Sequence, residues 1–176
     1  MDIRCFKRPP SRLLADILNR EHRRDLPENL HVIDPVARIW RSGQPVSGDS
    51  PSLAELGFRS VLNLRCHHSD RALLRGTGIK EYRMNFHVPT PEDMIEALRI
   101  VRKAGKPLLI HCWHGSDRTG AVAVGCRVVF NHWSIDEALR EFHTPGYGHH
   151  PRLYWALPRA LRCYDWRKIA AAVLTD

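Results

Sequence analysis

Long apolar runs are missing from this chain of 176 residues. No stretch approaches the ~20 residues that an apolar helix needs to cross a bilayer. Repeats and low-complexity tracts are absent, and the first ten residues hold neither the apolar core of a signal peptide nor a myristoylation glycine. We therefore expect a soluble, cytoplasmic protein with no transmembrane segment. An exported form whose signal has been removed would give the same pattern.

Paired cysteines and metal-ligand spacings are also lacking. Five cysteines make an odd number, which excludes a fully paired disulfide framework. None stands in a Cys-x-x-Cys pair, and this argues against a structural zinc site. The eleven histidines include two adjacent pairs, at 67–68 and 149–150, which we interpret as loop residues. We expect neither a metal nor any other cofactor. The cysteines are Cys5, Cys66, Cys112, Cys126 and Cys163.

Acidic residues are scarce relative to basic ones. The chain has 19 Asp and Glu against 27 Lys and Arg, which gives a net charge of +8. Such a charge favours anionic substrates and steers them toward the protein. The arginines are spread along the chain without a basic-aromatic RNA motif, so nucleic acid is not the partner that we expect. No pattern in the sequence determines the oligomeric state.

The apolar pattern predicts alternating strands and helices in one domain. With 43% hydrophobic residues, the chain is long enough to bury a core. We divide it into an N-terminal helical extension, residues 1–29, and a single domain, residues 30–176. The expected fold is an α/β three-layer sandwich whose central, mostly parallel sheet has about four to five strands. The expected strands are a hairpin within 30–41 and the segments 60–64, 80–86 and 108–111. The expected helices are 11–24, 52–56, 91–103, 118–131, one that begins at Ser134, and one or two within 151–174. We expect Gly105 to cap helix 91–103, a break near Pro158 in the last segment, and either a helix or a loop at 67–78.

The most informative segment is residues 111–120, HCWHGSDRTG, between the apolar strand 108–111 and a helix of small residues. A loop that wraps before a helix points its amides inward, and the helix N-terminus adds roughly half a positive charge. Cys112 would be a nucleophilic thiolate in this positive field. Arg118 offers a planar fork that fits two phosphate oxygens. Gly115 permits the turn, and the Thr119 hydroxyl is expected to stabilise the sulfur.

The pattern of this segment resembles the signature loop of cysteine-dependent protein tyrosine phosphatases, His-Cys-x5-Arg-Ser/Thr. It is most similar to small bacterial-type dual-specificity enzymes, whose loop ends His-Gly-x-Asp-Arg-Thr-Gly. The resemblance extends over about residues 30–165. Further matching segments are 41–45 (RSGQP), 61–65 (VLNLR), 133–138 (WSIDEA) and 146–151 (GYGHHP).

The resemblance implies a phosphomonoester hydrolase that forms a cysteinyl-phosphate and needs no metal. Its expected substrate is a phosphorylated protein or another phosphomonoester. Alternatives are a phosphoinositide or inositol phosphate phosphatase, a non-catalytic phosphoprotein-binding relative, and a sulfur-transfer or arsenate-reducing enzyme. The expected catalytic residues are Cys112 and Arg118, with Asp93 and Asp117 as candidates for the proton donor. His111 has a supporting role together with Thr119, and Tyr147, His149 and His150 are expected to form one rim of the pocket. The expected substrate-binding residues are Trp113, His114, Gly115, Ser116, Asp117, Arg118 and Thr119.

The proton donor for the leaving oxygen stays open between several carboxylates. In the family it is usually an aspartate on a loop upstream of the signature, where this chain has Glu92 and Asp93. Thr90, Pro91 and Asp93 also make a good helix start by themselves. Asp117 is a rival, because similar loops of myotubularin-like phosphatases use that aspartate, and Asp70 is a more distant candidate.

Cys66 carries a separate hypothesis. It directly follows the strand that is expected to lie beside the signature loop. A reversible disulfide between Cys66 and Cys112 under oxidant would resemble the redox protection of related phosphatases.

Overall fold

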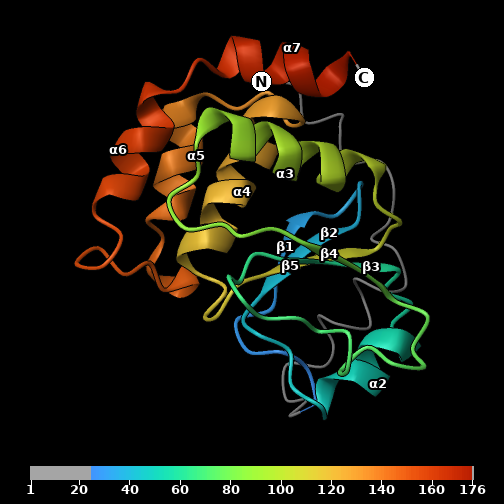
Figure 1. The fold of residues 1–176 in the computed structure, drawn as a ribbon. Coiled ribbons are helices and arrows are strands. Elements are labelled where there is room, and N and C mark those ends of the chain that lie inside the picture. Colours follow the sequence, from blue (N-terminus) through green and yellow to red (C-terminus); the bar gives the residue numbers. More distant parts are fainter. Residues whose placement is uncertain (1–24, 176) are drawn as a thin grey trace.

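A mostly parallel sheet lies at the centre of the computed structural model, which describes residues 25–175 (Figure 1). Within those residues the sheet has five strands in the order β1-β2-β5-β3-β4. β1 and β2 form the expected antiparallel hairpin, and the other neighbours are parallel. The expected helix 11–24 lies outside the described residues. The strands are β1 His31–Asp34, β2 Ile39–Ser42, β3 Ser60–Asn63, β4 Lys80–Arg83 and β5 Leu108–His111.

Helices cover both faces of this sheet, which confirms the expected three-layer α/β fold. Helix α2 lies on one face, and the remaining helices lie on the other (Figure 1). The helices are α2 Asp49–Glu55, α3 Pro91–Lys103, α4 Asp117–Val129, α5 Ile135–Phe142, α6 Ala156–Cys163 and α7 Trp166–Leu174, with a 3-10 turn, η2, at Pro145–Tyr147.

The central strand β5 is fully buried because both of its faces are covered. Leu108 and Ile110 pack into the larger apolar cluster, which the helices α3 to α7 share with the sheet. Leu109 points to the opposite face and joins Trp40 and Phe58 in the smaller cluster beside α2. All three β5 side chains have 0% exposure. The strand that leads to Cys112 is therefore rigidly held from both sides.

Two helix starts follow the capping chemistry that the sequence predicts. At α3, Asp93 N donates to Thr90 Oγ1 at 3.1 Å, and Thr90 N donates to Asp93 Oδ2 at 2.8 Å. At α5, the Ser134 and Glu137 pair forms the same reciprocal box. Each pair satisfies amide groups that a helix N-terminus otherwise leaves without partners.

The predicted position of the C-terminal helix break was wrong. Pro158 lies in the first turn of α6, where its missing N–H costs no intrahelical bond. The chain instead breaks after Cys163, because Tyr164 is extended and Asp165 caps α7 by accepting from Lys168 N at 3.1 Å.

Gly105 does not form the expected left-handed cap. Helix α3 ends at Lys103, and its C-cap residue Ala104 is extended, with ψ 148°. A small residue fits at 105 because an added Cβ would lie 3.2 Å from Arg59 Cβ. Other differences are modest: α2 begins at Asp49, β4 ends at Arg83 and α4 ends at Val129. Residues 67–78 form a loop, which is one of the two forms expected for them.

Among residues 25–175, no helix is both long and apolar enough to cross a membrane. The same residues contain no cluster of three or more histidine, cysteine or acidic side chains that could hold a metal ion.

Candidate active site

Three parallel strands bring the functional segments to one edge of the sheet. His111, the last residue of β5, pairs with Ser42 of β2 on one side and with Asn63 of β3 on the other. The segments that follow these three strands therefore converge at the carboxyl edge, where open α/β sheets bind ligands. Cys112 follows His111 directly and is 3% exposed.

The loop 112–116 has all of its carbonyl groups tied away from its centre. Each one accepts a hydrogen bond from a residue outside the loop. The donors are His111 Nδ1 to Cys112 O (3.1 Å), Gln44 N to Trp113 O (2.9 Å), Asn29 Nδ2 to His114 O (2.9 Å), and Arg41 Nη2 to Gly115 O (2.7 Å) and Ser116 O (3.0 Å).

The amide groups of the same loop remain available. Within the described residues, the N–H groups of 113–118 donate to no other residue. Asp117 and Arg118 already belong to the first turn of α4, whose amides point out of the helix end. Ser116 precedes this turn but makes no side-chain cap. Fixed outward carbonyls and free amides at a helix N-terminus form an anion-binding cradle.

Gly115 is required by this geometry. Its φ is +75°, and an added Cβ would lie 2.4 Å from the Ser42 carbonyl carbon. The loop can therefore turn against β2 only because this residue has no side chain. This confirms the conformational reason that the sequence suggested for the glycine.

Arg41 anchors the loop from β2. Its side chain is buried, with 3% exposure, and its guanidinium stacks 4.5 Å from the Tyr147 ring. Burial lowers the pKa of Arg41 below its ordinary value, while electrostatic interactions with Tyr147 and Cys112 oppose that effect. The planar fork explains why arginine suits this position, since it bonds two successive carbonyls at once. Sequence reasoning gave Arg41 no functional role.

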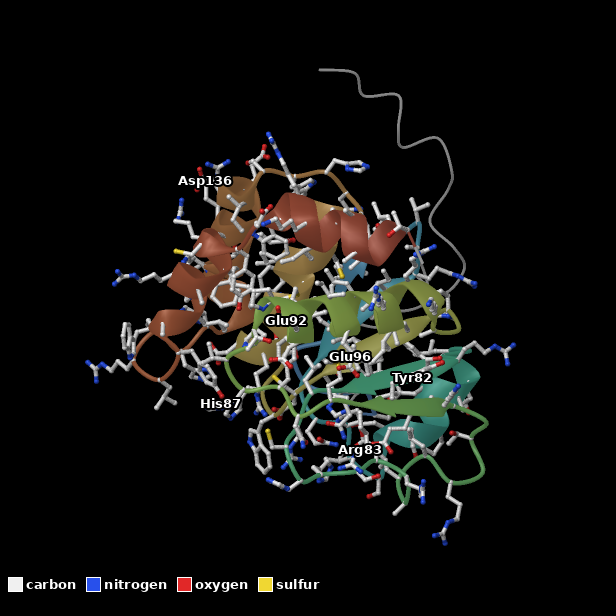
Figure 2. All side chains as sticks on the ribbon, turned by 45° about the horizontal axis from the view of Figure 1, so that its top comes forward. Tyr82, Arg83, His87, Glu92, Glu96 and Asp136 are labelled. Carbon is white, nitrogen blue, oxygen red and sulfur yellow. The ribbon has the colours of Figure 1, made fainter. Side chains whose placement is uncertain are left out.

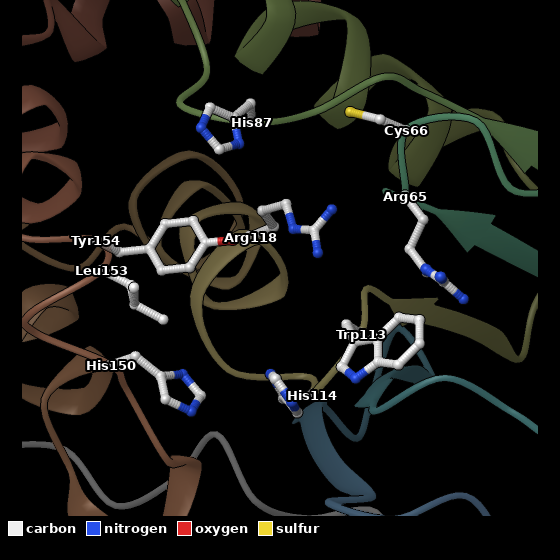
Figure 3. Close-up of a pocket in the computed structure, with 9 residues that line it drawn as sticks. All are labelled: Arg65, Cys66, His87, Trp113, His114, Arg118, His150, Leu153 and Tyr154. Atoms are coloured by element: carbon white, nitrogen blue, oxygen red, sulfur yellow. The ribbon is translucent and has the colours of Figure 1, made fainter.

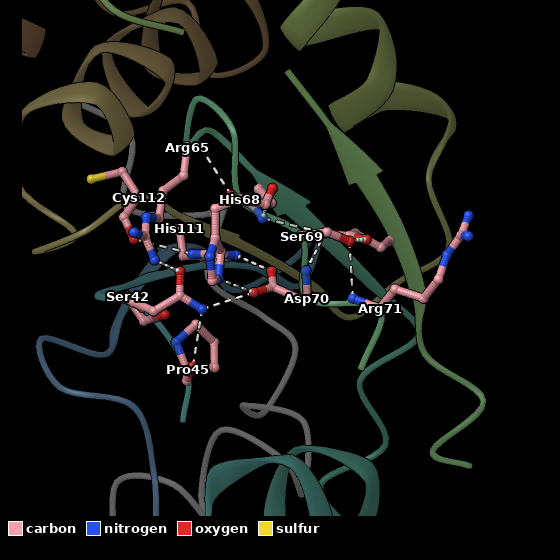
Figure 4. Close-up of polar contacts among 12 residues, drawn as sticks. Ser42, Pro45, Arg65, His68, Ser69, Asp70, Arg71, His111 and Cys112 are labelled. Atoms are coloured by element: carbon pink, nitrogen blue, oxygen red, sulfur yellow. Dashed lines mark hydrogen bonds and ion pairs between the residues drawn. The ribbon is translucent and has the colours of Figure 1, made fainter. Parts of the chain in front are cut away.

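His111 links the nucleophile to Asp70 (Figure 4). Its Nε2 lies 2.6 Å from Asp70 Oδ2, and its Nδ1 lies 3.1 Å from the Cys112 carbonyl. Both contacts are buried, so the ring is held between the main chain of the nucleophile and a carboxylate. His111 thus couples the position of Cys112 to Asp70, which lies 41 residues earlier in the chain.

Asp70 is the buried carboxylate that His111 contacts. Burial raises the pKa of its carboxyl, but hydrogen bonds from His111 and Gln44 outweigh this effect and hold the pKa below 3.8. Gln44 Nε2 donates to Asp70 Oδ1 at 2.7 Å, and His68 Nε2 lies 3.3 Å from the same oxygen. Asp70, which the sequence offered as a distant proton-donor candidate, is therefore committed to holding His111.

Two buried polar atoms beside the loop have no hydrogen-bond partner within the described residues: Arg118 Nε and Thr119 Oγ1. Arg118 makes a long contact of 3.3 Å from Nη1 to Leu64 O. The hydrogen bond expected from Thr119 to the Cys112 sulfur is not formed. Unpartnered buried donors are costly, and an oxyanion within the cradle would satisfy Arg118 Nε.

Asp117 is buried and fully engaged. Its Oδ1 accepts from His149 Nδ1 at 2.6 Å and from His150 N at 3.0 Å, and its Oδ2 accepts from His150 Nδ1 at 2.7 Å. The His149 ring packs 4.5 Å from Phe142. Asp117 therefore ties the loop before α6 to the start of α4.

A cavity of about 370 Å³ opens beside the cradle (Figure 3). Trp113, His114 and Arg118, all predicted site residues, line it. Glu92 and Asp93 do not line this cavity, since Asp93 caps α3 and Glu92 lines a separate groove against α7. The sequence gave no role in the pocket to the lining residues Arg65, His87 and Leu153. It did predict that Tyr147, His149 and His150 form one rim of the pocket. The full lining is Arg65, Cys66, His87, Trp113, His114, Arg118, His150, Leu153 and Tyr154.

A cradle of free amides around a buried cysteine and an arginine, at the carboxyl edge of a parallel sheet, defines the cysteine-based phosphatase class of α/β domains. Residues 26–148 match the model of the tyrosine phosphatase family. The chain belongs to that family, and this confirms the resemblance of its signature loop.

Relatives of two kinds are similar to the chain. The dual specificity protein phosphatase TpbA of Pseudomonas aeruginosa is 29% identical over 68% of this chain and 56% of its own length. The inositol diphosphatase DSP1 of Oryza sativa subsp. japonica is 34% identical over 66% of this chain and 56% of its own length. The chain thus spans just over half the length of these curated relatives.

Solved structures support the fold. The core catalytic domain of the PP-IP phosphatase SIW14 from S. cerevisiae, in complex with citrate, superposes with a TM-score of 0.71 at 26% identity, over 85% of this chain and 93% of that one. The crystal structure of P. aeruginosa TpbA gives a TM-score of 0.73 at 24% identity, over 84% and 91%.

Proposed function

We propose that this protein hydrolyses phosphate monoesters through a cysteinyl-phosphate intermediate, and that phosphorylated proteins are its main substrates. The observation that carries the proposal is the set of free amides at 113–118, which surround Cys112 while every carbonyl of 112–116 is held outward. Preorganised donors of this kind stabilise the charge of a transferring phosphoryl group. A cytoplasmic location belongs to the same proposal.

The reaction has two balanced steps. The Cys112 thiolate attacks phosphorus while Arg118 and the loop amides hold the equatorial oxygens. The P–S bond forms, the ester P–O bond breaks, and the leaving oxygen receives a proton. Water then attacks phosphorus and loses a proton, the P–S bond breaks, and inorganic phosphate leaves with the thiolate restored. Arg41, which bonds the carbonyls of Gly115 and Ser116, keeps the loop amides in place through both steps.

The walls of the cavity support a protein substrate. Trp113 is 54% exposed, and the Arg65 guanidinium lies 4.1 Å from its ring centroid. Leu153 and Tyr154 provide further apolar and aromatic surface on the same cavity. Such a rim suits the phenol ring of phosphotyrosine and the flanking side chains of a peptide.

A second candidate substrate class rests on the charge of the lining. Arginine and histidine supply five of the lining side chains, and no carboxylate lines the cavity among the described residues. A lining of this kind also suits an inositol phosphate with several phosphate groups. The inositol diphosphatase and PP-IP phosphatase relatives agree with this alternative.

The activity is tested with p-nitrophenyl phosphate on the wild type and on Cys112→Ser, with Cys163→Ser as the matched control because Cys163 is exposed and far along the chain. We expect hydrolysis by the wild type and the control, and none by Cys112→Ser. Wild-type inactivity, or retained activity in Cys112→Ser, would refute the proposal. Comparing kcat/KM for phosphotyrosine peptides, phosphothreonine peptides and an inositol diphosphate then decides between the substrate classes.

A further inference from the structure

The proposed reaction needs a proton donor for the leaving oxygen, and the carboxylates that the sequence suggested are not placed to supply it. Asp93 holds Thr90 in the capping box of α3. Glu92 projects from α3 into the groove against α7, whereas His87 lies on the loop that leads into this helix (Figure 2). Asp117 has both oxygens occupied, and Asp70 holds His111.

Three histidines line the cavity: His87, His114 and His150. Only His150 has a side-chain hydrogen bond within the described residues, from its Nδ1 to Asp117 Oδ2 at 2.7 Å. Its main-chain N–H also donates to Asp117, at 3.0 Å, so both the backbone and the ring are fixed on one carboxylate. Figure 3 shows the His150 ring on the cavity wall, facing the opening that contains Arg118.

The hydrogen bond to Asp117 determines which nitrogen can react. A carboxylate accepts, so Nδ1 of His150 carries the donated hydrogen and Nε2 is the nitrogen left for a ligand. The Asp117 side chain is 4% exposed, whereas that of His150 is 38% exposed. A buried carboxylate that bonds a partly exposed imidazole fixes the orientation and the tautomer of the ring.

We propose that His150, oriented by Asp117, is the proton donor in the phosphatase reaction. The proposal rests on the proposed function. In the first step Nε2–H of the imidazolium passes its proton to the leaving oxygen as the P–O bond breaks and the P–S bond forms. In the second step neutral Nε2 takes a proton from the attacking water as the P–S bond breaks. Asp117 acts through His150 and is a positioning residue.

Among the described residues that line the cavity or bond to the His150 ring, Asp117 is the single carboxylate. The His114 ring lies 5.0 Å away, and His149 shares the same carboxylate. Across the cavity the ionisable groups are Arg65, Cys66, His87, Arg118 and Tyr154.

The test compares substrates with good and poor leaving groups. p-Nitrophenolate leaves without protonation, whereas an alkoxide requires it. His150→Asn keeps an amide that can donate to Asp117 but has no proton at the Nε2 position, and His150→Gln serves as a second variant. We expect kcat/KM for an alkyl phosphate to fall by about 10²- to 10⁴-fold and that for p-nitrophenyl phosphate by less than about 10-fold. The basic limb of the pH profile for the alkyl phosphate should disappear.

His87→Gln is the matched control, since His87 lines the same cavity and makes no side-chain hydrogen bond within the described residues. The proposal is overturned if His87→Gln shows the leaving-group contrast in place of the His150 variants, or if the His150 variants lose both activities equally. Asp117→Asn should show the same contrast with a smaller loss, because the ring keeps its proton but loses its orientation. Failure of the phosphatase proposal itself is distinct, because then the wild type would not hydrolyse p-nitrophenyl phosphate.

Discussion

Replacing Gly115 with alanine tests the geometry of the anion cradle directly. The added Cβ would lie 2.4 Å from Ser42 C, 2.5 Å from Ser42 O and 2.6 Å from Gly43 N. All three are backbone atoms, so no side-chain rotation relieves the overlap. Non-bonded carbon atoms normally lie about 3.5–4.0 Å apart, so the loop or β2 must move by about 1 Å.

The expected magnitude is the sum of two costs. A left-handed backbone costs alanine about 1–2 kcal/mol, and overpacking typically costs about 1–3 kcal/mol. Gly115→Ala should therefore lower the free energy of unfolding by about 2–5 kcal/mol. A displacement of about 1 Å at a reacting group costs about 100-fold, so kcat/KM for p-nitrophenyl phosphate should fall by at least that factor.

Two other glycines provide controls for urea unfolding and initial-rate assays. Gly57 has φ +79° with nothing within 4 Å of an added Cβ, so Gly57→Ala measures the backbone cost alone. Gly48 has an ordinary φ of −70° and the same open space, so Gly48→Ala should change stability by less than about 0.5 kcal/mol. The reasoning fails if Gly115→Ala is no more destabilising than Gly57→Ala and keeps wild-type activity.

Three further outcomes concern Asp70 and the cysteines. Asp70→Asn should destabilise the fold by about 3 kcal/mol at neutral pH. Because the pKa of Asp70 is lowered in the folded protein, the stability that its carboxylate contributes is fully present above the ordinary aspartate pKa and is lost as the pH falls through the lowered folded value. Urea unfolding at several pH values measures this loss. Burial raises the pKa of Cys126 to about 12, so iodoacetamide at pH 8 should label the exposed Cys163 and spare Cys126 until the protein unfolds. Mild peroxide should yield a disulfide between Cys66 and Cys112, and peptide maps without that linkage would remove the redox hypothesis.

Local sequence signals predicted the elements that carry the site. Residues 108–111 and 91–103 have the predicted bounds in the structure, as β5 and α3. A continuous apolar run identified the buried strand, and a capping box with proline identified the helix start. These features depend on neighbours within a few positions, so one sequence is sufficient to reveal them.

The contacts that shape the cradle could not be predicted in the same way. Asn29 and Arg41 bond to carbonyls 85 and 74 residues further along the chain, and Asp70 bonds to His111 across 41 residues. No local pattern marks such pairs, because the folded sheet alone brings them together. Asn29 falls in the segment assigned to the N-terminal extension, yet it holds the loop.

The proton donor shows the limit of local reasoning most clearly. The sequence offered Asp93 both as an acid and as a capping residue, and in the structure its carboxylate makes the capping contacts. Asp117 precedes Arg118 directly in the sequence, but the sequence could not show that the side chains of His149 and His150 bond to its carboxylate. Those histidines were assigned to the pocket rim without a chemical role, because their partner is 32 or 33 residues away.

The construction of the cradle separates chemistry from selectivity. The groups that face an anion in the cradle are backbone amides. The residues that hold the loop in place donate hydrogen bonds to its carbonyls, so the side chains at 113 and 114 do not determine the shape of the cradle. Gln44 N bonds to the Trp113 carbonyl whatever side chain stands there, and that side chain is 54% exposed. Under the proposed function, Trp113 and His114 therefore tune which phosphate ester enters the cavity, while Cys112 and Arg118 keep the same reaction. A family built on this loop can accordingly include both dual-specificity and inositol phosphatases without changing its catalytic geometry.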